Sequence, residues 1–220
     1  MWKTTVTRDG ASGMAGFPTP QPVSLFLDAA LSSAIRGRAH RKEVAFLKRM
    51  ADGSHQAEGE QVPALYEYFE SCMVACVFSF FSIEVFANQC IWENISKPFE
   101  VQRNTKKKSY APDDLQRIPT DEKLQQVLPS IFHKKTRMPS QTWNSFTRLK
   151  NIRDSIVHLK SRNHYVRWKE DRDSVYHTFL NNEPSLYPQA AIDVMRFFVD
   201  RGKMRWLDAA EDYLKGAKTA

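Results

Sequence analysis

A run of 13 residues without a charged side chain, from Ser71 to Ile83, lies near the middle of the chain and limits the folds open to it. A helix that crosses a membrane needs about 20 apolar residues, and the polar residues Glu84, Asn88 and Gln89 follow the run closely. The run therefore predicts a buried helix. We expect this helix to extend from Pro63 to about Ile95 with other helices around it, because it is apolar on most sides.

Proline and glycine divide the rest of the 220-residue chain. The eleven prolines are spread along it, and no glycine occurs between Gly59 and Gly202. Proline interrupts helices, so this distribution predicts an all-α helical bundle with breaks between its helices. We expect an extended or disordered arm over 1–22 and a single domain over 23–220. Three further helices are predicted, from Ser24 to about Met50, from Ser140 to about Arg162, and after Pro188.

The segment 98–139 carries five of the eleven prolines and two basic runs. We expect a long, mobile loop here, with one short helix around Asp121 to Leu128. Its basic side chains are candidates for contact with RNA phosphates, and a solvated loop surface is the alternative. The candidates are Lys106, Lys107, Lys108, Lys134 and Lys135.

Charge and cysteine content narrow the class of protein. Lys and Arg total 32 against 25 Asp and Glu, a net charge of +7 that favours a polyanionic partner such as nucleic acid. Cys72, Cys76 and Cys90 are odd in number and have no C-x-x-C spacing, so neither a disulfide framework nor a thiolate metal site is indicated. With no secretory apolar segment at the N-terminus, a cytoplasmic location is expected.

Motifs for metal, cofactor and hydrolase chemistry are missing from the sequence. The six histidines form no H-E-x-x-H pattern, and no Walker A, G-x-S-x-G or G-x-G-x-x-G string occurs. We therefore expect no metal and no cofactor.

The helix predicted from Ser140 is amphipathic, because residues advance about 100° around a helix. Its apolar arc runs from Phe146 to Leu159, and its polar arc occupies the opposite side. The polar arc consists of Asn144, Arg148, Asn151, Ser155 and His158. Substrate could reach side chains on that arc.

Arg153 breaks this pattern, because it lies inside the apolar arc. A buried guanidinium needs a partner, since an unpaired charge in a core costs several kcal/mol. Glu84 is the only acid between Glu70 and Glu93, and Asn88 lies one turn later on the same face. We therefore predict that Arg153 packs against Glu84 and Asn88. A buried ion pair that specifies the bundle, without a catalytic duty, is the alternative.

The segment Arg153–His158 resembles the R-x4-6-H motif of the HEPN superfamily, which comprises small all-α domains. Many members are metal-independent endoribonucleases of bacterial toxin, antiphage and RNA-processing systems. The preceding LKNI and the SIEVFAN segment of the central helix also resemble sequences of bacterial members, so the resemblance covers roughly Pro63 to Arg162. Asp154 stands where active members more often carry Asn.

The resemblance implies an endoribonuclease that leaves a 2′,3′-cyclic phosphate and a 5′-hydroxyl, acting as a toxin or antiphage effector with an antitoxin or regulatory protein as partner. Histidine suits proton transfer near neutral pH, which assigns His158 this role. Arg153, Arg148 or Arg162 is expected to hold the phosphate. Asp154 completes the catalytic group, and the supporting residues are Glu84, Asn88, Asn151 and Ser155.

Arg153 and His158 are five residues apart, a net rotation of about 140°, so they do not share one face of the helix. A two-fold homodimer, which is usual in the family, would bring motifs from both chains together around RNA. A non-catalytic HEPN-like module that binds a partner protein or RNA is the alternative, favoured by Asp154 and by burial of Arg153.

Overall fold

The computed structural model describes residues 3–6, 15–18, 21–44, 48–49, 55–56, 59, 61–158 and 174–219. This part of the chain is mainly α-helical, as predicted. The longer helices are α1 (Pro22–Val44), α2 (Gln61–Asn94), α6 (Ser140–Val157), α7 (Val175–Asn181), α8 (Leu186–Phe198) and α9 (Arg205–Thr219). Two antiparallel strands, β1 (Lys3–Val6) and β2 (Ala15–Pro18), fall in the arm predicted over 1–22, and the other residues of 1–20 lie outside the described residues.

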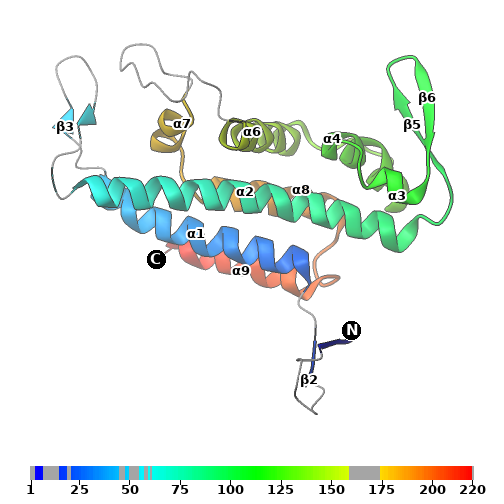
Figure 1. Ribbon diagram of the computed structural model, residues 1–220, viewed down its shortest axis with the longest axis horizontal. Helices are drawn as coiled ribbons and strands as arrows, with labels where there is room; N and C mark the ends of the chain where they lie inside the picture. The colour runs from blue at the N-terminus through cyan, green and yellow to red at the C-terminus, as the bar shows by residue number, and fades with distance from the viewer. Residues whose placement is uncertain are drawn as a thin grey trace.

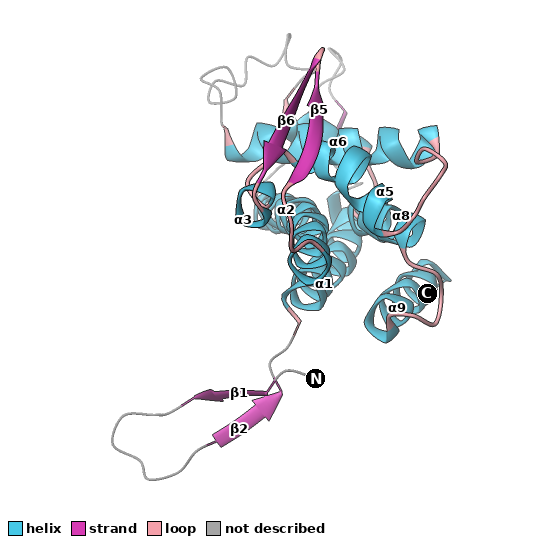
Figure 2. Ribbon diagram, turned by 90° about the vertical axis from the view of Figure 1, so that its right-hand side faces the viewer, coloured by secondary structure: helices cyan, strands magenta, loops and turns pink. Residues whose placement is uncertain are grey.

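The central helix α2 runs the length of the molecule and packs against α1, α6 and α8 (Figure 1). Its interior holds neither glycine nor proline. Pro63 lies in the first turn, where backbone N–H groups make no hydrogen bond within the helix, so the N–H that proline lacks costs nothing there. Figure 2 shows α6 and α9 on opposite sides of the pair formed by α1 and α2. The prediction of a long central helix wrapped by others is confirmed.

By length and composition α2 could also cross a membrane, and it is the one such helix among the described residues. Half of its most apolar 18-residue window is buried by other parts of this fold. All three cysteines of the chain are free and buried in α2, and burial raises the pKa of the Cys72 and Cys90 thiols to about 12. At neutral pH these thiols stay protonated and shielded.

Helix α1 differs from its prediction at both ends. It begins at Pro22, whose fixed φ suits a first helical position, and the Ser24 hydroxyl donates to the Gln21 carbonyl oxygen at 2.8 Å rather than capping the helix. The helix ends at Val44 and not near Met50, because Lys48–Arg49 forms β3, which pairs with β4 (His55–Gln56).

Gly37 lies where α1 crosses its neighbours closely. A Cβ atom at this position would lie 3.2 Å from the Ser71 Cβ and 3.3 Å from Pro184 Cγ. The missing side chain therefore allows α1 to approach α2 and the α7–α8 turn closely, and this contact offsets the low helix propensity of glycine.

The prediction of a long loop over 98–139 is wrong. Strands β5 (Phe99–Arg103) and β6 (Lys106–Tyr110) form a hairpin, closed by a turn in which Asn104 has φ of 51°. Val101 and Tyr110 bury their side chains at its base and so anchor it. The hairpin stands at the end of α2 (Figure 1). The prolines and charges of this segment predicted a loop, but the buried side chains of Val101 and Tyr110 hold its first part in a hairpin.

Short helices follow the hairpin and confirm the helix predicted around Asp121 to Leu128. They are α3 (Pro112–Leu115), α4 (Thr120–Glu122), the π-helical η1 (Lys123–Val127) and α5 (Leu128–Ile131). Each of the four buries at least one side chain, and all four pack along α2.

The chain after Pro188 forms two helices, not the single one predicted. Gly202, with φ of 86°, lies in the turn that separates α8 from α9. Across this turn Arg196 of α8 donates to Glu211 at 2.9 Å and also pairs with Asp208, so the two helices are held together by charge as well as by apolar packing. Helix α7 was not predicted.

Candidate functional site

The polar arc of α6 faces a shallow pocket between α6 and α7, which we call the α6–α7 pocket. Its volume is about 460 Å³. The apolar arc faces the core, where Phe146, Leu149 and Ile152 are buried, and Ile152 at its edge also lines the pocket. Helix α6 therefore fixes the polar side chains at the surface, as the sequence predicted. The lining residues are Asn144, Thr147, Arg148, Asn151, Ile152, Ser155, Val175 and Thr178.

Arg148 is held at this pocket by the turn that follows α7. Its Nη2 donates to Oδ1 of Asn182, and Nδ2 of Asn182 donates to the Thr178 carbonyl oxygen at 2.6 Å. Asn182 is only 6% exposed, and its backbone carbonyl oxygen lies 3.3 Å from the buried Tyr68 hydroxyl, which donates to the Phe179 carbonyl oxygen at 2.6 Å. No motif or periodicity points to Asn182, because residues 159–181 separate the motif helix from it.

His158 lies at the C-terminal end of the polar arc. It is the residue that follows α6, its side chain is exposed, and its N–H donates to the Asp154 carbonyl oxygen at 2.9 Å. One turn earlier the Ser155 hydroxyl donates to the Asn151 carbonyl oxygen at 2.9 Å. The His158 side chain is thus exposed about one turn beyond Ser155, which lines the pocket, and His158 itself is not among the lining residues.

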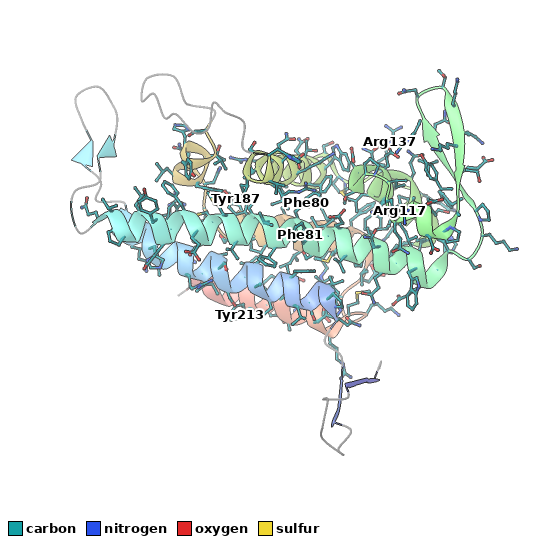
Figure 3. All side chains as sticks on the ribbon, viewed as in Figure 1. Phe80, Phe81, Arg117, Arg137, Tyr187 and Tyr213 are labelled. Atoms are coloured by element: carbon teal, nitrogen blue, oxygen red, sulfur yellow. The ribbon has the colours of Figure 1, made fainter. Side chains whose placement is uncertain are left out.

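Arg153 occupies a different environment, and its predicted pairing with Glu84 and Asn88 is wrong. Its guanidinium carbon lies 3.9 Å from the centre of the Phe80 ring, and Nη1 pairs with the Asp154 carboxylate at 2.8 Å. Figure 3 shows Phe80 between α2 and α6. The side chain is 19% exposed. The Phe80 ring and the Asp154 carboxylate partly compensate a guanidinium that the periodicity placed among apolar residues, while its buried Nε has no hydrogen-bond partner among the described residues.

Asn88 instead binds Lys123, which is 0% exposed. The Lys123 Nζ donates to the Asn88 Oδ1 and to the Gln116 carbonyl oxygen, both at 2.7 Å. Burial lowers the pKa of Lys123, and attraction to Glu84 opposes that shift. The polar face of α2 therefore holds η1 in place rather than α6, so Glu84 and Asn88 do not support the motif residues.

The basic candidates of 98–139 do not line the α6–α7 pocket. Lys106, Lys107 and Lys108 are exposed on β6, where Lys107 pairs with Glu100 at 3.3 Å. Figure 1 shows their hairpin at the end of α2 away from α7. Lys134 and Lys135 follow α5, and the Lys134 Nζ lies 5.7 Å from the centre of the Phe197 ring. Arg162 lies outside the described residues, and α6 ends at Val157, before the end predicted near Arg162.

In the part of the chain that the structure describes, no group of three His, Cys, Asp or Glu side chains is placed to hold a metal ion. Comparison of the chain with models of protein families, with curated proteins and with solved structures finds no match.

Proposed function

We propose that this protein is a HEPN-like, metal-independent endoribonuclease. One observation carries the proposal: the polar arc of α6 forms a wall of the α6–α7 pocket and ends in the exposed His158. A strand bound along this arc would bring a phosphodiester to an imidazole that solvent and substrate can both reach. The resemblance of Arg153–His158 to the R-x4-6-H motif supports the same reading.

The chemistry follows from these groups. His158 takes the proton of a ribose 2′-hydroxyl, and the 2′-oxygen attacks the adjacent phosphorus. The bond to the 5′-oxygen breaks, and that oxygen receives a proton from a second imidazole, so the products are a 2′,3′-cyclic phosphate and a 5′-hydroxyl. A guanidinium stabilises the charge that develops on the phosphoryl oxygens. Arg153 acts as a positioning residue, because Phe80 and Asp154 already engage it.

A homodimer supplies the second imidazole. We expect the interface to include the C-terminal end of α6, where Val157 is 52% exposed beside His158. Light scattering at micromolar concentration should give twice the 25.4 kDa mass of the chain. A stable monomer that cleaves RNA would contradict this interface.

The direct test of the function is cleavage without metal. Single-stranded RNA and stem-loop RNA incubated with the purified protein in EDTA should yield fragments with cyclic-phosphate ends, identified by mass spectrometry. A requirement for Mg²⁺ would contradict the mechanism. The proposed setting is a bacterial toxin or antiphage system in the cytoplasm, with an antitoxin or regulatory protein that withholds activity.

A non-catalytic HEPN-like module is the second candidate, and the contacts of Arg153 favour it. A guanidinium that is only 19% exposed, lies against Phe80 and is paired with the Asp154 carboxylate is poorly placed to reach a scissile phosphate. In that case the protein should bind RNA or a partner protein and leave the RNA intact.

A further inference from the structure

We propose that Arg148, oriented by Asn182, is the phosphate-binding residue of the α6–α7 pocket, and that the ligand is a phosphodiester of single-stranded RNA. This inference rests on the proposed function for its ligand, but it does not depend on cleavage. It assigns to Arg148 the phosphate contact that the motif would give to Arg153.

The lining of the pocket suits a polar anion. Among the described residues that line it, Arg148 is the one charged side chain, and no carboxylate is present. The other polar groups are the amides of Asn144 and Asn151 and the hydroxyls of Thr147, Ser155 and Thr178. Amides and hydroxyls pair with ribose hydroxyls and base edges, whereas a guanidinium pairs with phosphate oxygens.

The partner of Arg148 is neutral, and this distinguishes it from Arg153 and Arg196. Those two guanidinium groups pair with carboxylates, which cancel their charge locally. Asn182 accepts one N–H of Arg148 and leaves its positive charge intact. A guanidinium carries five N–H donors, so donors remain for the oxygens of a phosphate.

Asn182 is set before any ligand arrives. Its Nδ2 is committed to the Thr178 carbonyl oxygen, so Oδ1 is the atom that faces Arg148. Thr178 itself lines the pocket, and the side chain of Asn182 is buried. The contact therefore ties α6 to α7 and fixes a long, flexible side chain, which lowers the entropy lost when phosphate binds.

Binding of a 2′-O-methyl oligonucleotide tests this assignment without interference from cleavage, because this ligand has no 2′-hydroxyl to react. Fluorescence anisotropy at several salt concentrations gives the affinity and its salt dependence. Arg148→Gln should weaken binding about tenfold or more. The slope of log K against log salt should fall by about 0.7, the value for one phosphate contact on a single strand.

Arg117→Gln is the matched control, because it removes the same charge from an exposed site in the turn after α3 and should leave the affinity within about twofold. Asn182→Asp places a carboxylate against Arg148. It should weaken binding because the carboxylate pairs with the guanidinium and offsets its charge. Melting temperatures identify any variant that fails to fold. Because Arg148 is exposed, Arg148→Gln should keep the fold, and its affinity for the oligonucleotide tests the assignment even if the Asn182 variant does not fold.

Equal affinities of the Arg148→Gln and Arg117→Gln variants for the oligonucleotide would overturn the assignment. It would also be overturned if a polyglutamate peptide displaced the oligonucleotide and excess unlabelled RNA did not. If the Arg148 and Asn182 variants lose affinity for the oligonucleotide as expected but the wild-type protein does not cleave RNA, the phosphate site is upheld and the proposed nuclease function is excluded. Cleavage that Arg148→Gln leaves at the wild-type rate would uphold the nuclease and remove Arg148 from its site.

Discussion

Replacing Asn88 by alanine is expected to lower the free energy of unfolding by about 3 kcal/mol. The reason is Lys123, whose ammonium group is buried and depends on the Asn88 amide oxygen and the Gln116 carbonyl oxygen, both at 2.7 Å. Removing one acceptor leaves a buried cation short of a hydrogen bond. This cost should exceed that of an ordinary surface substitution several-fold.

Urea denaturation followed by circular dichroism measures the change, with Gln89→Ala as the control. Gln89 is the next residue of α2, and its amide makes an exposed hydrogen bond to Glu93 at 2.8 Å, so its loss should cost under about 1 kcal/mol. Adding Lys123→Met to Asn88→Ala should restore most of the stability, because the cation that needed Asn88 is gone. Equal losses for Asn88→Ala and Gln89→Ala would show that Lys123 does not depend on this contact.

The pH dependence offers a second readout of the same contact. Burial lowers the pKa of Lys123 below its ordinary value of 10.5, despite the attraction to Glu84. Between the lowered value and 10.5 the unfolded chain binds more protons at this residue than the folded chain does. This group should therefore make the protein more stable as pH rises through that window, and Lys123→Met should remove the contribution.

The elements that the sequence predicted are those whose pattern is local. The uncharged run Ser71–Ile83 predicted α2. The helical periodicity of polar and apolar residues predicted α6 and placed its polar arc at the surface. The same periodicity also identified Arg153 as a misfit that needed partners. The buried face of a helix follows from the spacing of apolar residues within that helix, so it can be predicted without knowing which distant segments pack against it.

The failures concern contacts between distant segments. Periodicity required a partner for Arg153 but could not choose between Glu84 and the ring of Phe80, one turn earlier on α2. No local pattern marks Lys123 for burial, whereas the fold buries it against Asn88, 35 residues away in the sequence. Asn182 could not be found at all, since its importance comes from a packing contact with α6.

His158→Ala is expected to reduce RNA cleavage by about 10²- to 10⁴-fold, the usual cost of removing a general acid–base group. The fold should survive, because the side chain is exposed and the hydrogen bond that His158 makes within the described part of the chain runs from its backbone N–H to the Asp154 carbonyl oxygen. An alanine keeps that bond. An unchanged melting temperature together with lost cleavage would separate chemistry from folding.

His177→Ala is the matched control, since it removes a second exposed imidazole, on α7, that makes only local contacts with Asn181. It should cleave the same RNA in EDTA within about twofold of the wild type, because an imidazole away from the reacting atoms transfers no proton.

Binding of the 2′-O-methyl oligonucleotide should be unaffected by His158→Ala, because the substitution removes a proton-transfer group and leaves Arg148 in place. Cleavage by His158→Ala at the wild-type rate would exclude this imidazole from the reaction. Equal losses in both variants would instead point to a general effect on the surface around the α6–α7 pocket.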